Sequence, residues 1–127
     1  MPNRKFVAKE LANLFGVLSH PDRVRIVTEL RSAEMDVNSL QTALGVSHSR
    51  VSQHLSQLRV QRMVLERREG RHVFYRLRQP GLGRWLLEGL EFVERDVELA
   101  VELRDAVAEV KGLWSAPPPP AVAEGAG

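Results

Sequence analysis

The chain has 127 residues, of which 43% are hydrophobic and 27% charged, values that are ordinary for one small globular domain. No apolar run approaches the roughly 20 residues that a membrane-spanning helix needs, and the first ten residues lack the apolar segment of a secretory signal. We therefore expect a cytoplasmic protein. The absence of cysteine excludes disulfides and thiolate metal sites.

The net charge of +2 conceals an uneven distribution of charge along the chain. Residues 1–80 hold 14 Lys and Arg against 7 Asp and Glu, a net +7, whereas residues 81–127 hold 4 against 9, a net −5. Within the first part, residues 47–78 hold eight arginines and two carboxylates. The planar fork of arginine matches phosphate and base acceptors, so this pattern favours a surface that faces nucleic acid over an ordinary solvated face.

Apolar periodicity and capping residues predict three helices at the start of the chain. An amphipathic helix is expected over residues 5–18. A second helix begins at Pro21, because proline is favoured at the first helical position. Asp36 is the expected cap of a short third helix, and Gly45 fits just past its end, where a left-handed conformation is common.

A fourth helix is expected over residues 48–62, with Ser47 as its cap. Its apolar stripe, formed by Val51, Leu55 and Leu58, would bury one side and leave polar side chains on the other. The tight turn before it is typical of a helix-turn-helix, whose second helix enters the DNA major groove and reads base edges. The residues expected to contact DNA from this helix and its cap are Ser47, His48, Ser49, Arg50, Ser52, Gln53, His54 and Ser56.

Two short strands, residues 64–68 and 71–77, predict a β-hairpin that follows the fourth helix as a wing. The turn is expected at Glu69-Gly70, where glycine permits a positive φ. Arginines beside this turn can reach a minor groove or the phosphate backbone and add salt-sensitive affinity. The residues expected to contact DNA from the wing are Arg67, Arg68, Gly70 and Arg71.

A long final helix is expected from Pro80 to about Leu113, and it exceeds what so small a core requires. Its surplus apolar stripe, together with the first helix, predicts a homodimer interface. Residues 1–4 are expected to be flexible, residues 5–113 to form the domain, and residues 114–127, rich in Pro, Ala and Gly, to be disordered. The residues expected at the interface are Val7, Leu11, Leu14, Leu86, Leu90, Val93, Val97 and Ala100.

Two runs of the sequence resemble the ArsR/SmtB family of bacterial repressors. Residues 44–59 contain the pattern Val-Ser-Gln-His-Leu, and residues 68–77 contain Glu-Gly-Arg-x-Val-x-Tyr-x-Leu. Residues 18–27 resemble the second-helix signature of that family, and the resemblance covers about residues 5–110. It implies a mainly α fold with a small β-hairpin wing, here a winged helix-turn-helix of five helices that dimerises through its first and last helices. It also implies a non-enzymatic repressor of double-stranded DNA, bound to a palindromic operator and released by an inducer that the sequence does not identify.

The chain departs from the metal-sensing members of the family. Many of these use cysteines in the third helix, or histidine and carboxylate pairs on the last helix; this chain has no cysteine, and residues 81–113 have no histidine. We therefore predict no metal site, no cofactor and no catalytic residue. Two alternatives stay open: a metal-responsive repressor with a non-standard His/carboxylate site, and a winged-helix module that binds protein through its acidic final helix or proline-rich tail.

Overall fold

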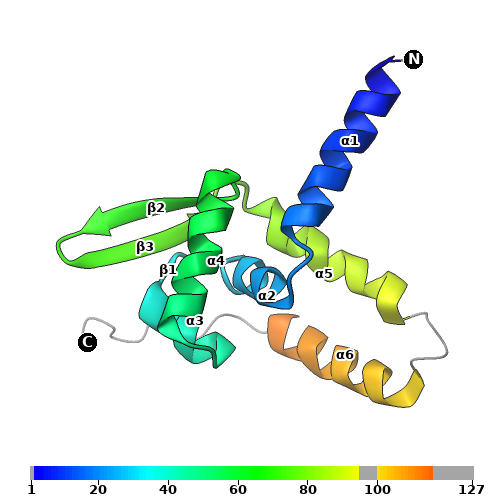
Figure 1. The fold of residues 1–127 in the computed structure, drawn as a ribbon. Coiled ribbons are helices and arrows are strands. Elements are labelled where there is room, and N and C mark those ends of the chain that lie inside the picture. The colour runs from blue at the N-terminus through cyan, green and yellow to red at the C-terminus, as the bar shows by residue number, and fades with distance from the viewer. Residues whose placement is uncertain (1, 95–99, 116–127) are drawn as a thin grey trace. The chain divides into compact units, whose positions relative to one another are not determined.

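The computed structural model describes residues 2–94 and 100–115, which form six helices and one antiparallel sheet of three strands (Figure 1). The chain divides into two compact units, Met1–Leu86 and Leu87–Gly127. In chain order the elements are α1 (Pro2–Val17), α2 (Pro21–Glu29), β1 (Met35–Asp36), α3 (Val37–Leu44), α4 (His48–Val60), β2 (Val64–Glu69), β3 (His72–Leu77), α5 (Gly81–Glu94) and α6 (Ala100–Ser115).

The helix-turn-helix of the first unit, α3 and α4, forms where the capping residues predict it. The carboxylate of Asp36 accepts a hydrogen bond from the backbone N–H of Ser39 at 2.7 Å, and the hydroxyl of Ser47 accepts one from the N–H of Arg50 at 3.2 Å. Gly45 ends α3 with a φ of 70°, in the left-handed region that favours glycine. These three capping predictions are confirmed, and together they fix where α4 begins.

The predicted apolar stripe anchors α4 in the core. Val51, Leu55 and Leu58 each have 0% of their surface exposed, and α2 contributes Ile26 and Val27, which are equally buried. A helix with one buried stripe presents its opposite side to solvent, so the core sets which side chains of α4 face outward. The same cluster of buried residues also contains Leu18, Leu30, Leu40, Leu44, Val64 and Leu77.

The wing is the antiparallel pair β2 and β3, as predicted, but its turn lies one residue later. Glu69 pairs with His72, so the two turn residues are Gly70 and Arg71 rather than Glu69 and Gly70. Gly70 has a φ of 61°, and a type II′ turn requires such a glycine at its first central position. The two-residue strand β1, too short to show any periodicity in the sequence, pairs with β3 and gives the strand order β1-β3-β2.

The single final helix predicted from Pro80 to Leu113 is wrong, because α5 and α6 are separate helices. The ammonium group of Lys111 donates a hydrogen bond of 2.6 Å to the carboxylate of Glu94, 17 positions earlier. In one straight helix these residues would be about 25 Å apart, since the rise is about 1.5 Å per residue. The described residues therefore contain six helices instead of five. The sequence concealed the break, because the helical spacing of apolar residues continues past Glu94.

Apolar side chains predicted to form a dimer interface are exposed on α1 and on the end of α5. The exposed fractions are 56% for Val7 and 47% for Leu11 on α1, and 44% for Val93 on α5. Within the first unit, the ring of Phe15 stacks on that of Trp85 with 5.9 Å between centroids, and both side chains stay more than two-fifths exposed. An uncovered apolar helix face is consistent with the predicted homodimer, which stays a prediction.

The other predicted interface residues differ in their surroundings. Leu14, Leu86 and Leu90 are half-buried, and the first two of these pack against the core of the first unit. Val97 lies outside the described residues, and Ala100 is the first residue of α6. Across residues 2–94 and 100–115, no helix combines the length and the apolar character needed to cross a bilayer.

Candidate nucleic-acid interface

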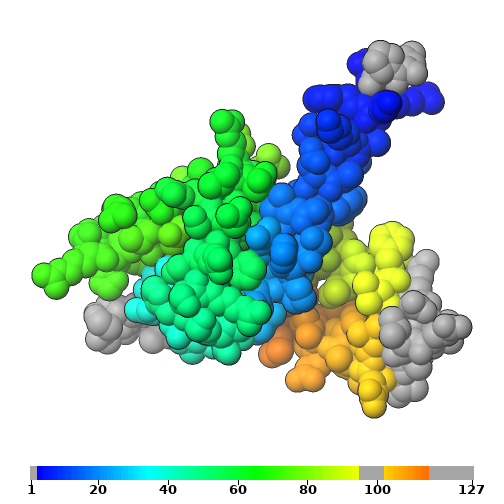
Figure 2. Space-filling model, viewed as in Figure 1, coloured from blue at the N-terminus to red at the C-terminus, as the bar shows by residue number. Residues whose placement is uncertain are grey.

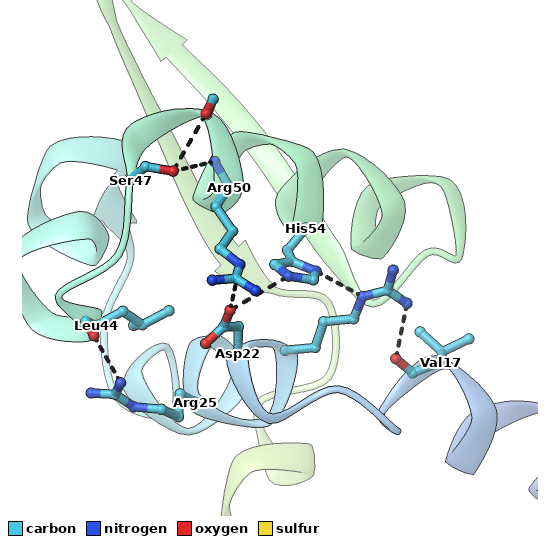
Figure 3. Close-up of polar contacts among 9 residues, drawn as sticks. Val17, Asp22, Arg25, Leu44, Ser47, Arg50 and His54 are labelled. Carbon is cyan, nitrogen blue, oxygen red and sulfur yellow. Dashed lines mark hydrogen bonds and ion pairs between the residues drawn. The ribbon is translucent and has the colours of Figure 1, made fainter.

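Arginine side chains from α2 hold the helix-turn-helix in place. The guanidinium of Arg25 donates to the carbonyl oxygens of Ala43 and Leu44 at 2.9 and 2.8 Å, as Figure 3 shows for Leu44. These carbonyls belong to the last turn of α3, where backbone acceptors lack helical partners and a positive charge is favoured. Arg25 therefore caps the end of α3 and ties it to α2, directly before the turn into α4.

The outward side of α4 is polar, and the whole helix contains no carboxylate. His48, Ser49 and Gln53 are exposed, as are the predicted contact residues Ser47 and Ser56 on either side of them. Side chains of these types donate to and accept from base edges, and a helix without carboxylates does not repel phosphate. Figure 2 shows α4, in green, on the visible face of the first unit with the β2–β3 hairpin beside it.

Two further residues of the predicted set, Arg50 and His54, lie in a polar cluster with α2. Nε of Arg50 is 3.2 Å from the Asp22 carboxylate, and Nε2 of His54 is 3.7 Å from the same oxygen (Figure 3). Nε of Arg23 donates to Nδ1 of His54 at 3.1 Å, and its Nη1 donates to the carbonyl of Val17. The cluster therefore joins the end of α1, the start of α2 and the middle of α4.

The surroundings of His54 favour its neutral form. Its side chain is 16% exposed, and burial lowers its pKa below the ordinary value of 6.5. The neighbouring positive charge of Arg23 lowers the pKa further, whereas the carboxylate of Asp22 opposes the shift. Because Nδ1 accepts from Arg23, the imidazole carries its proton on Nε2. His54 thus packs from α4 against α2. Ser52, another residue predicted to contact DNA, is half-buried.

The predicted wing arginines have different surroundings. Arg67 makes two hydrogen bonds to the carboxylate of Glu34, one of them 3.2 Å from Nε to Oε2, and a third of 2.7 Å to Glu69. Its guanidinium also lies 4.7 Å above the ring of Phe74. The bonds from Arg67 hold the pKa of Glu34 below 4.5, and those from the two carboxylates raise the pKa of Arg67. Arg67 is therefore committed to intramolecular contacts.

The tip of the wing is open to solvent. Arg68, Gly70 and Arg71 are all exposed, and neither arginine is in an ion pair within the part of the chain that the structure describes. These positions can accept phosphate without first breaking an internal bond. Three of the predicted DNA-contacting residues, Arg50, His54 and Arg67, thus bind charged side chains from outside α4. The other predicted residues, on α4, its cap and the wing tip, make no such contact within the described part of the chain.

Sequence reasoning missed the residues that position the predicted site. Asp22, Arg23 and Arg25 lie in the run that resembles the second-helix signature of the family, so the signal was present, but a motif does not reveal which partner a side chain takes. Glu34 precedes a two-residue strand and has no pattern around it. Among residues 2–94 and 100–115, no three His, Asp or Glu side chains lie close enough together to hold a metal ion.

This combination of an anchored, carboxylate-free second helix and an arginine-bearing hairpin defines a winged helix-turn-helix protein. Residues 20–65 match the family described as "Bacterial regulatory protein, arsR family". The chain is 40% identical over 80 residues to the arsenic resistance transcriptional regulator ArsR2 of Pseudomonas putida, a match that covers 62% of this chain and 69% of that protein. The chain therefore belongs to the arsR family.

Solved structures agree with this assignment. The transcriptional repressor BigR of Xylella fastidiosa is similar with a TM-score of 0.61 and 33% identity, over 72% of this chain and 90% of that one. A homodimeric winged helix-turn-helix DNA-binding domain from Mycobacterium bovis has a TM-score of 0.59 and 25% identity, over 78% of this chain and 90% of that one. The chain spans about half the length of other curated relatives that it matches.

Proposed function

We propose that this protein is a transcriptional repressor that binds a palindromic operator in double-stranded DNA as a homodimer in the cytoplasm. The observation that carries the proposal is the exposed face of α4, which is polar, free of carboxylates and fixed by a fully buried stripe. A reading helix has to hold its side chains at a defined depth in the major groove, and a buried stripe supplies that constraint. Membership of the arsR family and the named repressor BigR support the regulatory role.

Each part of the surface has its own proposed task. The exposed side chains at the start of α4 read base edges, with Gln53 suited to adenine and Arg50 to guanine. Arg68 and Arg71 at the wing tip bind the phosphate backbone, which adds affinity without sequence information. In a dimer the two copies of α4 would enter major grooves about 34–36 Å apart, one helical turn of DNA. The signal that releases the operator is unidentified.

A fluorescence-anisotropy titration tests the DNA-binding role. The probe is a labelled duplex from the region upstream of the protein's own gene, and the competitor is a scrambled duplex of equal length. We expect binding that weakens linearly in log affinity against log salt, because bound arginines release counterions from phosphate. The matched protein control is the Arg50→Ala, Gln53→Ala double variant, which should lose the preference for the upstream duplex. Absence of salt-sensitive binding by the wild type would refute the proposal.

The homodimer is supported by the exposed apolar face of α1 and by the homodimeric relative. Substitution of Leu11, 47% exposed, by Glu places a charge on this face and should shift the protein to monomers in sedimentation velocity. The control is Lys9→Glu, which makes a larger change in charge on the opposite side of the same helix. A wild-type monomer at micromolar concentration, or equal dissociation of both variants, would count against this interface.

A further inference from the structure

A carboxylate lies within the basic surface of the proposed DNA interface. Oδ2 of Asp22, in the first turn of α2, is 3.2 Å from Nε of Arg50 on α4 (Figure 3). The Asp22 side chain is only 19% exposed, whereas that of Arg50 is 63% exposed. A largely covered acid therefore lies against a guanidinium group on a side chain that is mostly open to solvent.

This contact is an ion pair between the Arg50 guanidinium and the Asp22 carboxylate, in which Nε is the nearest nitrogen. Arginine has five N–H donors, and Nε carries one of them. Among the described residues, none of the guanidinium N–H groups of Arg50 donates a hydrogen bond, so its terminal donors stay available. Terminal donors of this kind can form the paired bonds to guanine that distinguish it from other bases. The arrangement therefore presents an arginine that an ion pair holds beside α2 and whose N–H donors stay available to a base.

Two physical effects follow from the position of Asp22. An unrestrained arginine loses considerable rotamer freedom when it docks, and a carboxylate at Nε removes part of that loss in advance. The negative charge of Asp22 also disfavours contact between this surface and phosphate groups, which attract Arg50 on any sequence. The first effect strengthens binding to the correct site, and the second weakens binding elsewhere.

We propose that Asp22 is a positioning residue for sequence recognition, which aims the terminal nitrogens of Arg50 at a base edge and penalises binding to other sequences. The proposal rests on the DNA-binding function proposed above. It assigns to Asp22 a contribution to selectivity that has no equivalent at the tip of the wing, where Arg68 and Arg71 are without ion-pair partners among the described residues. Asp22 itself need not touch DNA.

The test compares affinity for an operator, selected with the wild-type protein from random duplexes, with affinity for a scrambled duplex. For Asp22→Asn we expect this ratio to fall on the order of tenfold, within the range of a lost bidentate base contact, while affinity for the scrambled duplex holds or rises. In an Arg50→Ala background the same change should alter the ratio less than about twofold, since the pair no longer exists. Asp22→Glu, which keeps the charge, should restore part of the ratio.

A matched control and a second readout separate positioning from folding. Glu66→Gln removes another carboxylate that pairs with an α4 arginine, Arg59, at 3.4 Å, and it should leave the ratio unchanged. Arginine Nε–H signals in a nitrogen-15 NMR spectrum of the free protein report the contact without DNA. We expect a higher order parameter for the Arg50 Nε–H than for that of exposed Arg71, because an ion pair restrains the Arg50 side chain. Asp22→Asn should lower the Arg50 value, and Asp22→Glu should preserve it.

The outcomes distinguish the two proposals. An unchanged ratio in Asp22→Asn, an equal loss on both duplexes, or the same loss without Arg50 would overturn the role of Asp22 and leave the DNA-binding function standing. Equal order parameters of the Arg50 and Arg71 Nε–H groups in the wild type would overturn it even where Asp22→Asn fails to fold. A wild type that selects no sequence would overturn the DNA-binding function and, with it, the role of Asp22.

Discussion

The recognition helix α4 and the β2–β3 wing are attached to the first unit by different kinds of interaction. The helix is anchored through three fully buried side chains, spaced along its length. The wing is fully buried only at its base, where Val64 and Leu77 are 1% and 4% exposed and form a pair in the sheet, and the half-buried Tyr75 adds a further contact with the core. Further along the wing, ion pairs of Arg67 take the place of a core.

This difference suits two distinct tasks in DNA binding. A base-reading surface needs side chains held within a fraction of an ångström, which close packing provides. A phosphate-binding surface tolerates movement, because charge acts over longer distances and carries no sequence information. Selectivity is therefore expected to depend on α4 and its contacts to α2, whereas overall affinity is expected to depend on the wing tip.

The largest expected effect comes from breaking the anchor of α4. Leu55→Ala removes a side chain that is 0% exposed at the centre of the stripe, and it should lower the free energy of unfolding by about 2–5 kcal/mol. Urea denaturation followed by circular dichroism measures this loss. Leu65→Ala on β2 is the control, since that leucine is 38% exposed and its removal should cost less than about 0.5 kcal/mol. Equal losses would show that the wing is as well anchored as the helix.

The next largest effect concerns DNA and separates the two tasks directly. Arg50→Ala should lower discrimination between operator and scrambled duplex by about 1–3 kcal/mol. Arg71→Ala at the wing tip should weaken binding to both duplexes alike and reduce the salt slope by about one. Anisotropy titrations over a series of salt concentrations measure both quantities. A loss of discrimination from Arg71→Ala, or a uniform loss from Arg50→Ala, would reverse the assignment of tasks.

The sequence predicted the parts of the fold that depend on local physics. Helix caps, the buried stripe of α4 and the alternation of the hairpin are properties of a few neighbouring residues, and Asp36, Gly45 and Ser47 act as predicted. The break between α5 and α6 was not predictable in this way, because apolar spacing continues past Glu94. Only a contact between distant residues, the pair of Glu94 and Lys111, reveals it.

The sequence predicted which residues belong to the candidate site, but it did not predict the ion pairs that these residues form. Residue type and helix position indicated which side chains of α4 lie near its surface, and most of them are exposed. Nothing local indicated that Arg50 and His54 meet Asp22, or that Arg67 meets Glu34 from 33 positions away. Ion pairs form between elements that the fold brings together, so they follow from tertiary structure rather than from pattern.

A smaller effect is expected from loosening the wing at Glu34. Its side chain is 33% exposed and that of Arg67 39%, so solvent screens the pair, and Glu34→Gln should cost no more than about 1 kcal/mol of folding free energy at neutral pH. Arg67 holds the pKa of Glu34 below 4.5, so this stability is present above pH 4.5 and is lost as the pH falls through the lowered pKa.

Urea titrations of wild type and Glu34→Gln at neutral and acidic pH measure this contribution. The difference between the two proteins should shrink on acidification, since the wild-type carboxyl becomes neutral as well. Glu69→Gln is the control, because this second partner of Arg67 is 69% exposed and contributes one bond instead of two. A difference that persists in acid would mean that Glu34 acts through packing and not through its charge.

The smallest effect expected from α4 is a pH dependence that arises at His54. Burial, reinforced by Arg23, lowers the pKa of this imidazole below 6.5, although Asp22 acts in the opposite direction. The unfolded chain therefore takes up a proton at His54 before the folded protein does, and folding loses stability as the pH falls through 6.5. His54→Asn offers an amide oxygen in place of the Nδ1 acceptor and does not titrate, so its stability should fall less between about pH 8 and about pH 5.5. His48→Asn, at an exposed position of the same helix, is the control for the loss of an imidazole, and its stability should change with pH as that of the wild type does. If the stability of His54→Asn fell with pH in parallel with the wild type, the contact from Arg23 would not depend on the protonation of His54.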